Sequence, residues 1–281
     1  MSTGLTELDT FLKGGLRPGR TTVVAARTGM GKSMLALSMA LHCAVRLKRP
    51  AQIVSLEMSH SELSTRILAA ETGIATERFR RGLTKEEHQK VLAEGANREP
   101  REAPLFLGGD VLRSGGPDPS WTPAGIRRGC TEILRQHEKL DLLMVDYLSL
   151  MRTTRPLGIT PDRDQELAQV VADLTALAAE MNTALVIVEQ LTRATERREG
   201  HRPRLTDLTN REALLEHADA VILLYRDRYY APPQRYVPAQ GPNAHPPAPE
   251  PAELHVARTA HGETGVADVQ VDLTSCQLSW R

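Results

Sequence analysis

Residues 26–33 read Ala-Arg-Thr-Gly-Met-Gly-Lys-Ser, a glycine-containing turn that ends in a lysine and a hydroxyl side chain. The run follows the pattern G-x-x-x-x-G-K followed by Ser or Thr, except that Ala26 takes the first glycine position. A β-branched stretch at 21–25 precedes it, and a helix-periodic stretch at 34–45 follows it. Backbone N–H groups of such a turn, with the positive end of the next helix, can surround a polyphosphate. The pattern predicts a nucleotide site, and a glycine turn that caps a helix is the alternative.

The chemistry of this turn assigns roles to its side chains. We expect the Lys32 ammonium to contact the outer phosphates and the Ser33 hydroxyl to ligate Mg²⁺. The predicted nucleotide-binding residues are Ala26, Arg27, Thr28, Gly29, Met30, Gly31, Lys32 and Ser33.

Three further polar residues close predicted strands. Asp146 ends an apolar strand, where an acidic residue can hold Mg²⁺, although it could instead cap a turn. Glu57 ends another strand, where a carboxylate can accept the proton of an attacking water, and a surface glutamate before a helix is the alternative. Gln190 ends a third, where its amide can sense a phosphate or orient water, but glutamine is common at strand ends. One sheet edge would gather all three around the turn.

The elements that must position these residues alternate between strand and helix. This order predicts an α/β fold, a mostly parallel twisted sheet with helices on both faces and ligands at the carboxyl ends of its strands. We expect a single domain over 1–281, with a proline-dense segment at 231–251 that forms a mobile surface insertion and no helix or sheet interior. The predicted strands are 21–25, 52–56, 104–107, 140–146, 184–188, 219–225, 253–257 and 266–273, and the predicted helices are 34–45, 59–72, 84–96, 123–137 and 166–182.

Composition sets the broad class. The 281 residues are 41% hydrophobic, enough for a large core, and their formal net charge is zero, so any nucleic-acid contact must come from local arginine-rich loops. The three cysteines, Cys43, Cys130 and Cys276, lie far apart and predict reduced thiols. With no signal peptide and no apolar run of membrane-spanning length, we expect a cytoplasmic, soluble protein without a membrane partner.

Taken together, these motifs resemble the RecA-like ATPase domain of DnaB-type hexameric replicative DNA helicases. The resemblance covers nearly the whole chain in the same order. It is carried by Thr3–Asp9, the turn at 26–33 with its alanine, Ser55-Leu56-Glu57-Met58-Ser59, Val145–Met151, Gln190-Leu191-Thr192-Arg193 and Tyr225-Arg226-Asp227. It implies a RecA-like P-loop NTPase with ATP and Mg²⁺ as cofactors. It also implies catalytic roles for Glu57, Lys32 and Gln190, and metal binding by Ser33 and Asp146.

Three departures from the family are visible. The chain begins at the ATPase domain, so we expect no N-terminal helical domain. Where the family has a lysine and an arginine that reach a neighbouring subunit's nucleotide, this chain has Arg258 and Ala260, so Arg258 is the trans-acting candidate. Loss of such an arginine finger costs roughly 10³ to 10⁵ in rate in related chemistry, so hydrolysis is expected to be weak unless Arg258 substitutes. Glu212 replaces a glycine of the family's DNA-gripping loop, although Arg211 could restore part of that grip.

Arginine-rich segments are the candidates for contact with single-stranded DNA, through its phosphates because no aromatic residue lies among them. A solvated loop with interspersed Glu196 and Glu199 is the alternative. The candidates are Arg152, Arg155, Arg193, Arg197, Arg198, Arg202 and Arg211.

The leading hypothesis is an ATP- and Mg²⁺-dependent DNA helicase or translocase that acts as a homo-oligomeric ring, expected to be a hexamer, on single-stranded DNA in replication, with replication-loading proteins as further partners. The alternative is a nucleotide-gated assembly or regulatory ATPase that unwinds nothing. A RecA-like recombination or circadian-type ATPase fits less well, because the Ser-Leu-Glu-Met-Ser segment points elsewhere.

Overall fold

The computed structural model describes residues 1–96, 103–108, 122–153, 162–231 and 249–280. Within these ranges all strands join one nine-stranded sheet in the order β3-β2-β4-β5-β1-β6-β7-β8-β9. Neighbouring strands are parallel from β3 to β6 and antiparallel from β6 to β9. The strands are β1 (Thr21–Ala26), β2 (Ala51–Ser55), β3 (Leu105–Gly108), β4 (Leu142–Asp146), β5 (Ala184–Gln190), β6 (Ala218–Tyr225), β7 (Glu250–Thr259), β8 (Gly265–Asp272) and β9 (Gln277–Trp280).

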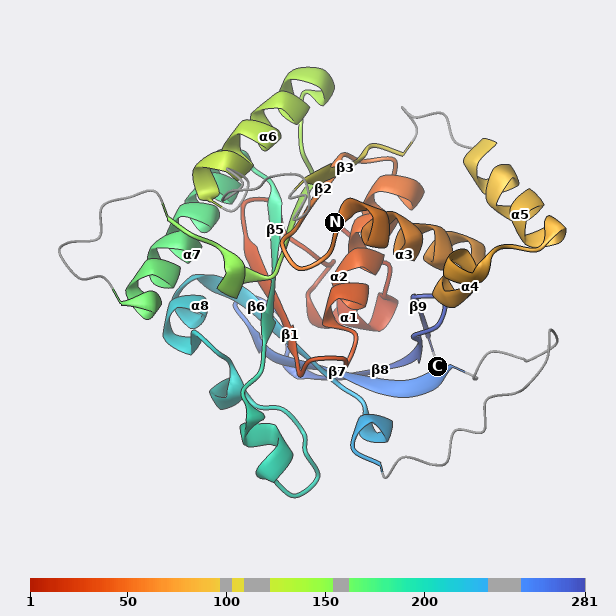
Figure 1. The fold of residues 1–281 in the computed structure, drawn as a ribbon. Helices are drawn as coiled ribbons and strands as arrows, with labels where there is room; N and C mark the ends of the chain where they lie inside the picture. Colours follow the sequence, from red (N-terminus) through yellow and green to blue (C-terminus); the bar gives the residue numbers. More distant parts are fainter. Residues whose placement is uncertain (97–102, 109–121, 154–161, 232–248, 281) are drawn as a thin grey trace.

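Helices cover both faces of this sheet, as Figure 1 shows, with α1, α2 and α3 on one side and α6, α7 and α8 on the other. The described α-helices are α1 (Thr6–Phe11), α2 (Lys32–Leu41), α3 (His60–Thr72), α4 (Thr76–Arg81), α5 (Lys85–Ala96), α6 (Pro123–His137), α7 (Arg163–Glu180) and α8 (Arg211–His217). Side chains alternate along each central strand, so Val24 packs into one core and Val23 into the other. The predicted α/β architecture, a mostly parallel sheet with helices on both faces, is therefore confirmed.

Several helices begin where the local sequence predicted. Glu62 N donates to Ser59 Oγ and Ser59 N donates to Glu62 Oε2, both at 3.2 Å, which forms the expected capping box of α3. The same reciprocal pair forms at the start of α5, between Thr84, which precedes the helix, and Glu87 in its first turn. Helix α6 spans Pro123–His137, the range that the sequence predicted.

The proline-dense segment corrects one expectation. Strand β7 begins at Glu250, so Pro251 belongs to a strand and pairs with Gln270 of β8. Pairing with β6 starts only at Glu253, opposite Tyr225, so the β6 side of Pro251 needs no backbone donor. The predicted segment 231–251 therefore extends two residues into β7, where Glu250 and Pro251 pair on one side only and are not in the sheet interior. Residues 232–248 lie outside the described residues. The structure also adds α1, α4, α8 and β9, which are too short to show a clear apolar period.

Candidate nucleotide-binding site

The turn at 26–33 connects β1 directly to α2. Gly29 and Gly31 have φ values of +80° and +104°, which disfavour any side chain, and Gly31 is the N-cap of α2. Ala26 is the last residue of β1, lies outside the positive-φ positions, and packs its methyl group fully buried in the core. A Cβ is therefore compatible with the first position of this loop, and the departure from glycine has no cost in backbone strain.

The polar residues predicted at strand ends do meet at one edge of the sheet. Asp146 ends β4, with Ser55 of β2 on one side of it and Val188 of β5 on the other. Gln190 ends β5 opposite Ala26 of β1, immediately before the turn. Glu57 follows β2 by two residues, and Leu56 N donates to the Asp146 carbonyl at 2.6 Å. The fold thus brings together residues that are up to 164 positions apart in the chain.

Lys32 and Glu57 are in direct contact. The Lys32 Nζ lies 3.4 Å from Glu57 Oε2 and 5.3 Å from the centre of the Tyr147 ring. The Lys32 side chain is only 7% exposed, whereas the Glu57 side chain is 43% exposed. The ammonium is therefore held at a fixed place over the loop, and the carboxylate faces solvent, where it can meet a water molecule.

Asp146 is the most unusual carboxylate in the described structure. It is fully buried, and neither Oδ1 nor Oδ2 accepts a hydrogen bond from any residue that the structure describes. Burial raises the pKa of Asp146, while Lys32 and the nearby Ser33 hydroxyl oppose this rise. A turn-capping carboxylate would accept backbone N–H groups, so the capping interpretation is not supported. Two buried oxygens without donors are suited to a cation.

The other residues of the loop divide between the cavity and the protein interior. Thr28 Oγ1 donates to Gln190 Oε1 at 3.4 Å, which ties the loop to the end of β5. Arg27 turns toward the segment after β5, where Nη1 donates to the Leu191 carbonyl at 2.7 Å and Nη2 pairs with Glu196. Met30 is buried in the core. Ala26, Arg27 and Met30 are thus absent from the lining of the cavity that the rest of the loop forms.

A cavity of about 670 Å³ opens beside the loop. Thr28, Gly29, Gly31, Lys32, Ser33 and Glu57 line it, together with one face of α3. That face contributes Arg66, four residues after Glu62 and close enough to Asp146 to lower its pKa slightly. The sequence interpretation missed Arg66, and its helical spacing from Glu62 is the signal that places it on the same face.

The candidate DNA-binding arginines are not equivalent. Arg198 forms a bidentate pair with the buried Asp207 at 2.8 Å, and Arg202 pairs with Glu253 while stacking over the Tyr225 ring at 5.1 Å. Arg152 is 3.6 Å from Glu166. Arg193, Arg197 and Arg211 are exposed and form no ion pair within the described ranges. Arg155 lies outside the described residues.

Two of the positions at which this chain departs from the family, Arg258 and Ala260, lie near the start of β6, at the opposite edge of the sheet from the loop. Arg258 is in β7 and its Nη1 donates to the Leu215 carbonyl of α8 in the same chain. Ala260 is exposed, and its N–H donates to the Asp219 carbonyl at 2.7 Å. Glu212 is exposed in the first turn of α8.

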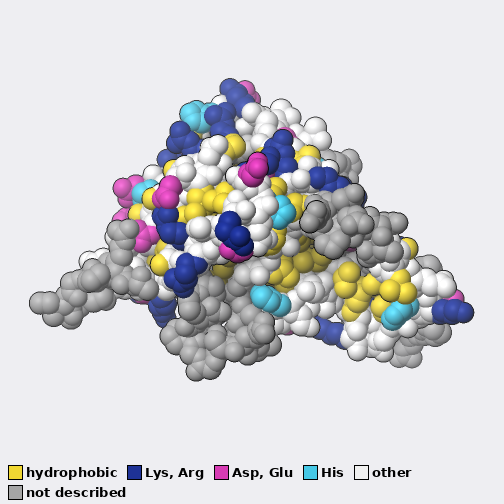
Figure 2. Space-filling model, turned by 90° about the horizontal axis from the view of Figure 1, so that it is seen from above, with side chains coloured by type: hydrophobic (Ala, Val, Ile, Leu, Met, Phe, Trp, Pro, Cys, Tyr) yellow, Lys and Arg dark blue, Asp and Glu magenta, His cyan; other side chains and the backbone are white. Residues whose placement is uncertain are grey.

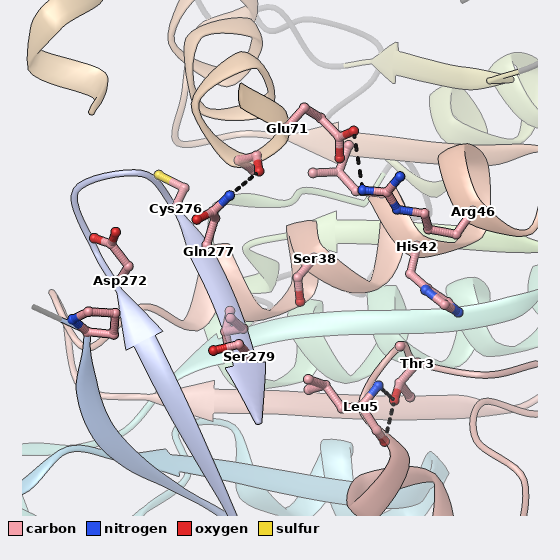
Figure 3. A pocket seen from close by; sticks show the side chains of 15 residues that line it. Thr3, Leu5, Ser38, His42, Arg46, Glu71, Asp272, Cys276, Gln277 and Ser279 are labelled. Atoms are coloured by element: carbon pink, nitrogen blue, oxygen red, sulfur yellow. Dashed lines mark hydrogen bonds and ion pairs between the residues drawn. The ribbon is translucent and has the colours of Figure 1, made fainter. Parts of the chain in front are cut away.

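A second cavity, of about 400 Å³, lies between the N-terminal segment, α2 and β9, as Figure 3 shows. Gln277 Nε2 donates to the Ala70 carbonyl at 2.8 Å and Arg46 faces Glu71 at 4.0 Å across its wall. None of the predicted site residues lines it. On the face drawn in Figure 2, basic and acidic side chains are interspersed, in keeping with the balanced net charge. No helix among the described residues is long and apolar enough to cross a membrane.

Comparison with known proteins agrees with this geometry. Residues 1–277 match the family described as the DnaB-like helicase C terminal domain. The chain is 34% identical over 228 residues to the replicative DNA helicase DnaB of Leifsonia xyli, covering 81% of this chain and 47% of that protein. It is 32% identical over 212 residues to a probable plasmid replicative DNA helicase of Chlamydia trachomatis, covering 75% of this chain and 44% of that protein.

A solved structure has a similar fold. A solved DnaB-like replicative helicase, described with its interactions with primase, superimposes with a TM-score of 0.80 at 23% identity, over 100% of this chain and 61% of that one. The chain thus spans about half the length of the curated relatives it matches. On the match over 1–277 and the arrangement of its loop and strand ends, the chain belongs to the DnaB-like helicase C-terminal domain family.

Proposed function

We propose that this chain is the motor domain of a DnaB-type DNA helicase, which hydrolyses ATP with Mg²⁺ between neighbouring subunits of a ring and moves along single-stranded DNA. The observation that carries the proposal is the buried Asp146 carboxylate, which has no hydrogen-bond donor in the described structure and stands beside Ser33 and Lys32. Relatives of this chain are named replicative DNA helicases, which supports DNA as its substrate.

The donor set fits a divalent cation. Asp146 offers two buried carboxylate oxygens and Ser33 a hydroxyl, and hard oxygen ligands of this kind suit Mg²⁺. Bound there with ATP, Mg²⁺ would neutralise charge that builds on the outer phosphates during transfer. No cluster of three or more His, Cys, Asp and Glu side chains occurs in the described ranges, so the site would depend on phosphate oxygens and water to complete its ligands.

The chain's own residues supply binding and proton transfer. The Gly31 N-cap and the start of α2 present N–H groups to the phosphates, and Lys32 adds a fixed ammonium. Glu57, exposed at the mouth of the cavity, accepts the proton of the attacking water. Gln190 meets the loop through Thr28 and senses the outer phosphate.

The end of β5 also offers a route from the nucleotide to DNA. Thr209 Oγ1 donates to the Gln190 carbonyl at 2.7 Å, and Leu191 pairs with Leu208 in an isolated bridge. A shift of Gln190 on hydrolysis would therefore move residues 207–211, which lead into α8 and carry Arg211. In the ring, Arg258 would leave the Leu215 carbonyl and reach the neighbour's phosphates. We place this ring in the cytoplasm.

The test is the ATPase rate with and without single-stranded DNA at stated salt concentration. We expect DNA to stimulate hydrolysis in the unmodified chain, and the stimulation to be absent in Glu57→Gln. Glu77→Gln, on the exposed face of α4, is the matched control and is expected to behave as the unmodified chain. A rate near zero that DNA does not change would refute the motor.

Such a flat rate would favour the second candidate, a nucleotide-gated assembly or regulatory ATPase. The observation in its favour is that Ala260 carries no side chain able to reach a neighbour, while Arg258 is bound within its own subunit. Native mass measurement with and without ATP, combined with an unwinding assay on a forked duplex, separates the two, because a regulator of this kind assembles on nucleotide without unwinding the duplex.

A further inference from the structure

An arginine that the proposed reaction does not use lies directly behind the phosphate loop. Arg226 follows the last residue of β6 and is only 6% exposed. A guanidinium has five N–H donors and keeps its charge, so burial requires several acceptors around it. The identity of those acceptors indicates what Arg226 does.

Two of the acceptors are carbonyl oxygens of the phosphate loop itself. Arg226 Nη1 donates to the Gly29 carbonyl at 3.1 Å and to the Met30 carbonyl at 3.2 Å. These carbonyls belong to the two peptide groups that lead into Met30 and Gly31. The other edge of the guanidinium donates to Glu250, the first residue of β7, whose side chain is 11% exposed.

The geometry of the peptide group explains why these contacts matter. In a planar trans peptide the C=O of one residue and the N–H of the next point in opposite directions. When Arg226 holds the Met30 carbonyl, the Gly31 N–H is therefore directed to the other side of the peptide, where Gly31 lines the cavity. A loop whose N–H groups converge on a phosphate must turn its carbonyls inward, and those carbonyls need donors.

We propose that Arg226, held in place by Glu250, is a positioning residue that fixes the peptides of Gly29 and Met30 so that the phosphate loop can receive a polyphosphate. It contacts the loop backbone and does not touch the nucleotide. The inference rests on the proposed function, since it concerns the same ATP site.

Arg226 contributes to nucleotide binding through the loop geometry that it fixes more than through its charge. Glu250 neutralises the charge of Arg226, so little net field remains for the phosphates. Gly29 and Gly31 have positive φ values and are the most pliable residues of the loop, which makes external support effective at this point. Arg228 shares Glu250 at 3.6 Å but is 59% exposed and donates to no loop carbonyl among the described hydrogen bonds. It is therefore a matched control.

The experiment compares Arg226→Met, Arg226→Lys and Arg228→Met in the full chain, with the dissociation constant of Mg-ATP measured by a fluorescent analogue and the melting temperature by circular dichroism. Hydrogen bonds from a charged donor are worth enough to predict a ~10- to 100-fold loss of affinity in Arg226→Met. Lysine can reach one carbonyl, so Arg226→Lys should recover part of this loss. Arg228→Met should keep its affinity within about twofold.

Partial recovery by lysine at an unchanged melting temperature distinguishes loop positioning from general support of the fold. A folded Arg226→Met that binds Mg-ATP as tightly as the unmodified chain overturns the inference. If Arg226→Met does not fold, Arg226→Lys decides, and unchanged affinity in that variant overturns the inference. The proposed function fails separately, when the unmodified chain shows no Mg-ATP binding that Lys32→Ala removes.

Discussion

The ammonium of Lys32 and the carboxylate of Glu57 lie 3.4 Å apart across the opening of the loop cavity. Lysine is the group expected to bind the outer phosphates, and glutamate is the group expected to take a proton from water. In this structure the two groups satisfy each other, although the Asp146 carboxylate also lies near Lys32. A triphosphate that enters the cavity must replace this contact, which links binding to the release of Glu57.

Lys32→Ala removes the ammonium from the loop. We expect it to weaken Mg-ATP binding by ~10- to 100-fold, the value of one or two charge-assisted hydrogen bonds. Isothermal titration measures the change, with Lys90→Ala on the exposed surface of α5 as control. Equal affinity in the two variants would remove the case for a phosphate loop at 26–33.

Glu57→Gln separates binding from chemistry. Hydrolysis should fall by about 10²- to 10⁴-fold, the usual contribution of a general base. Affinity for Mg-ATP should stay equal or rise, because glutamine no longer competes for Lys32 and no longer repels the phosphates. Single-turnover hydrolysis and equilibrium binding on the same sample provide both numbers. Weaker binding in Glu57→Gln would show that Glu57 supports the loop instead of acting on water.

Asp146→Asn should stabilise the ligand-free chain but weaken the effect of Mg²⁺ on ATP binding. The buried carboxylate has no described hydrogen-bond donor, so its replacement by a neutral amide should raise the free energy of unfolding of the ligand-free chain by about 1 kcal/mol or more. The same change removes a metal ligand. Urea unfolding without ligand and ATP binding over a Mg²⁺ series are the measurements. A variant that is destabilised, and in which Mg²⁺ still tightens ATP binding, would contradict the assignment.

Glu189 predicts a pH dependence of stability. It is fully buried in β5, accepts hydrogen bonds from Ser149 Oγ at 2.9 Å and Gln190 N at 2.7 Å, and has no cation beside it among the described residues. Burial raises the pKa of Glu189 above its ordinary 4.5, against the effect of those hydrogen bonds. With the folded pKa above the unfolded one, its stabilising contribution is complete below 4.5 and is lost as the pH rises through the raised value.

Glu189→Gln should therefore be more stable than the unmodified chain at high pH, and the difference should shrink as the pH falls. Urea midpoints from about pH 5 to about pH 9 measure it. Glu180→Gln is the control, and its difference from the unmodified chain should stay constant over this range, because Arg127 holds the pKa of Glu180 below its ordinary value and the group is ionised throughout. A difference between Glu189→Gln and the unmodified chain that is constant with pH would show that Glu189 is ionised in the folded chain as it is in the unfolded chain, which would contradict the raised pKa.

The parts of this structure that sequence could predict are those with local signals. The phosphate turn, the Ser59–Glu62 capping box and the apolar strand that ends in Asp146 each depend on residues within one short segment. The grouping of the polar residues that end these strands could also be predicted, because parallel strands place their carboxyl ends on one edge of the sheet.

The missing parts depend on interactions between distant segments. Arg226 reaches the loop carbonyls across 197 and 196 positions of the chain, and its partner Glu250 lies in the proline-dense segment, which suggested no sheet. Arg198 looked like any other arginine of its loop, and only the folded chain places the buried Asp207 beneath it. Sequence therefore identified the residues that carry the chemistry better than those that hold them in place.

That distinction divides the candidate DNA-binding arginines into two groups. Arg193 and Arg197 are exposed and unpaired within the described ranges, so they are free to meet phosphates. Arg198 is not free to meet a phosphate, because its guanidinium donates hydrogen bonds to Asp207. Burial raises the pKa of Asp207, but the hydrogen bonds from Arg198 hold it below its ordinary value. The double variant Arg193→Ala/Arg197→Ala should keep its stability, whereas Arg198→Ala should lose about 1–3 kcal/mol, because Asp207 is left buried without its partner.

Fluorescence anisotropy with labelled oligothymidine over a salt series tests the DNA side. Removing one arginine–phosphate ion pair should reduce the slope of log affinity against log salt by about 0.7 for a single strand, so the double variant should show a smaller slope than the unmodified chain. Arg228→Met, on the surface near β7 and outside these loops, serves as the control for charge alone. An unchanged slope in the double variant would make the 193–197 segment a solvated loop. Arg211 would then be the remaining candidate in the described structure that is exposed and forms no ion pair, because Arg152 faces Glu166 and Arg202 pairs with Glu253.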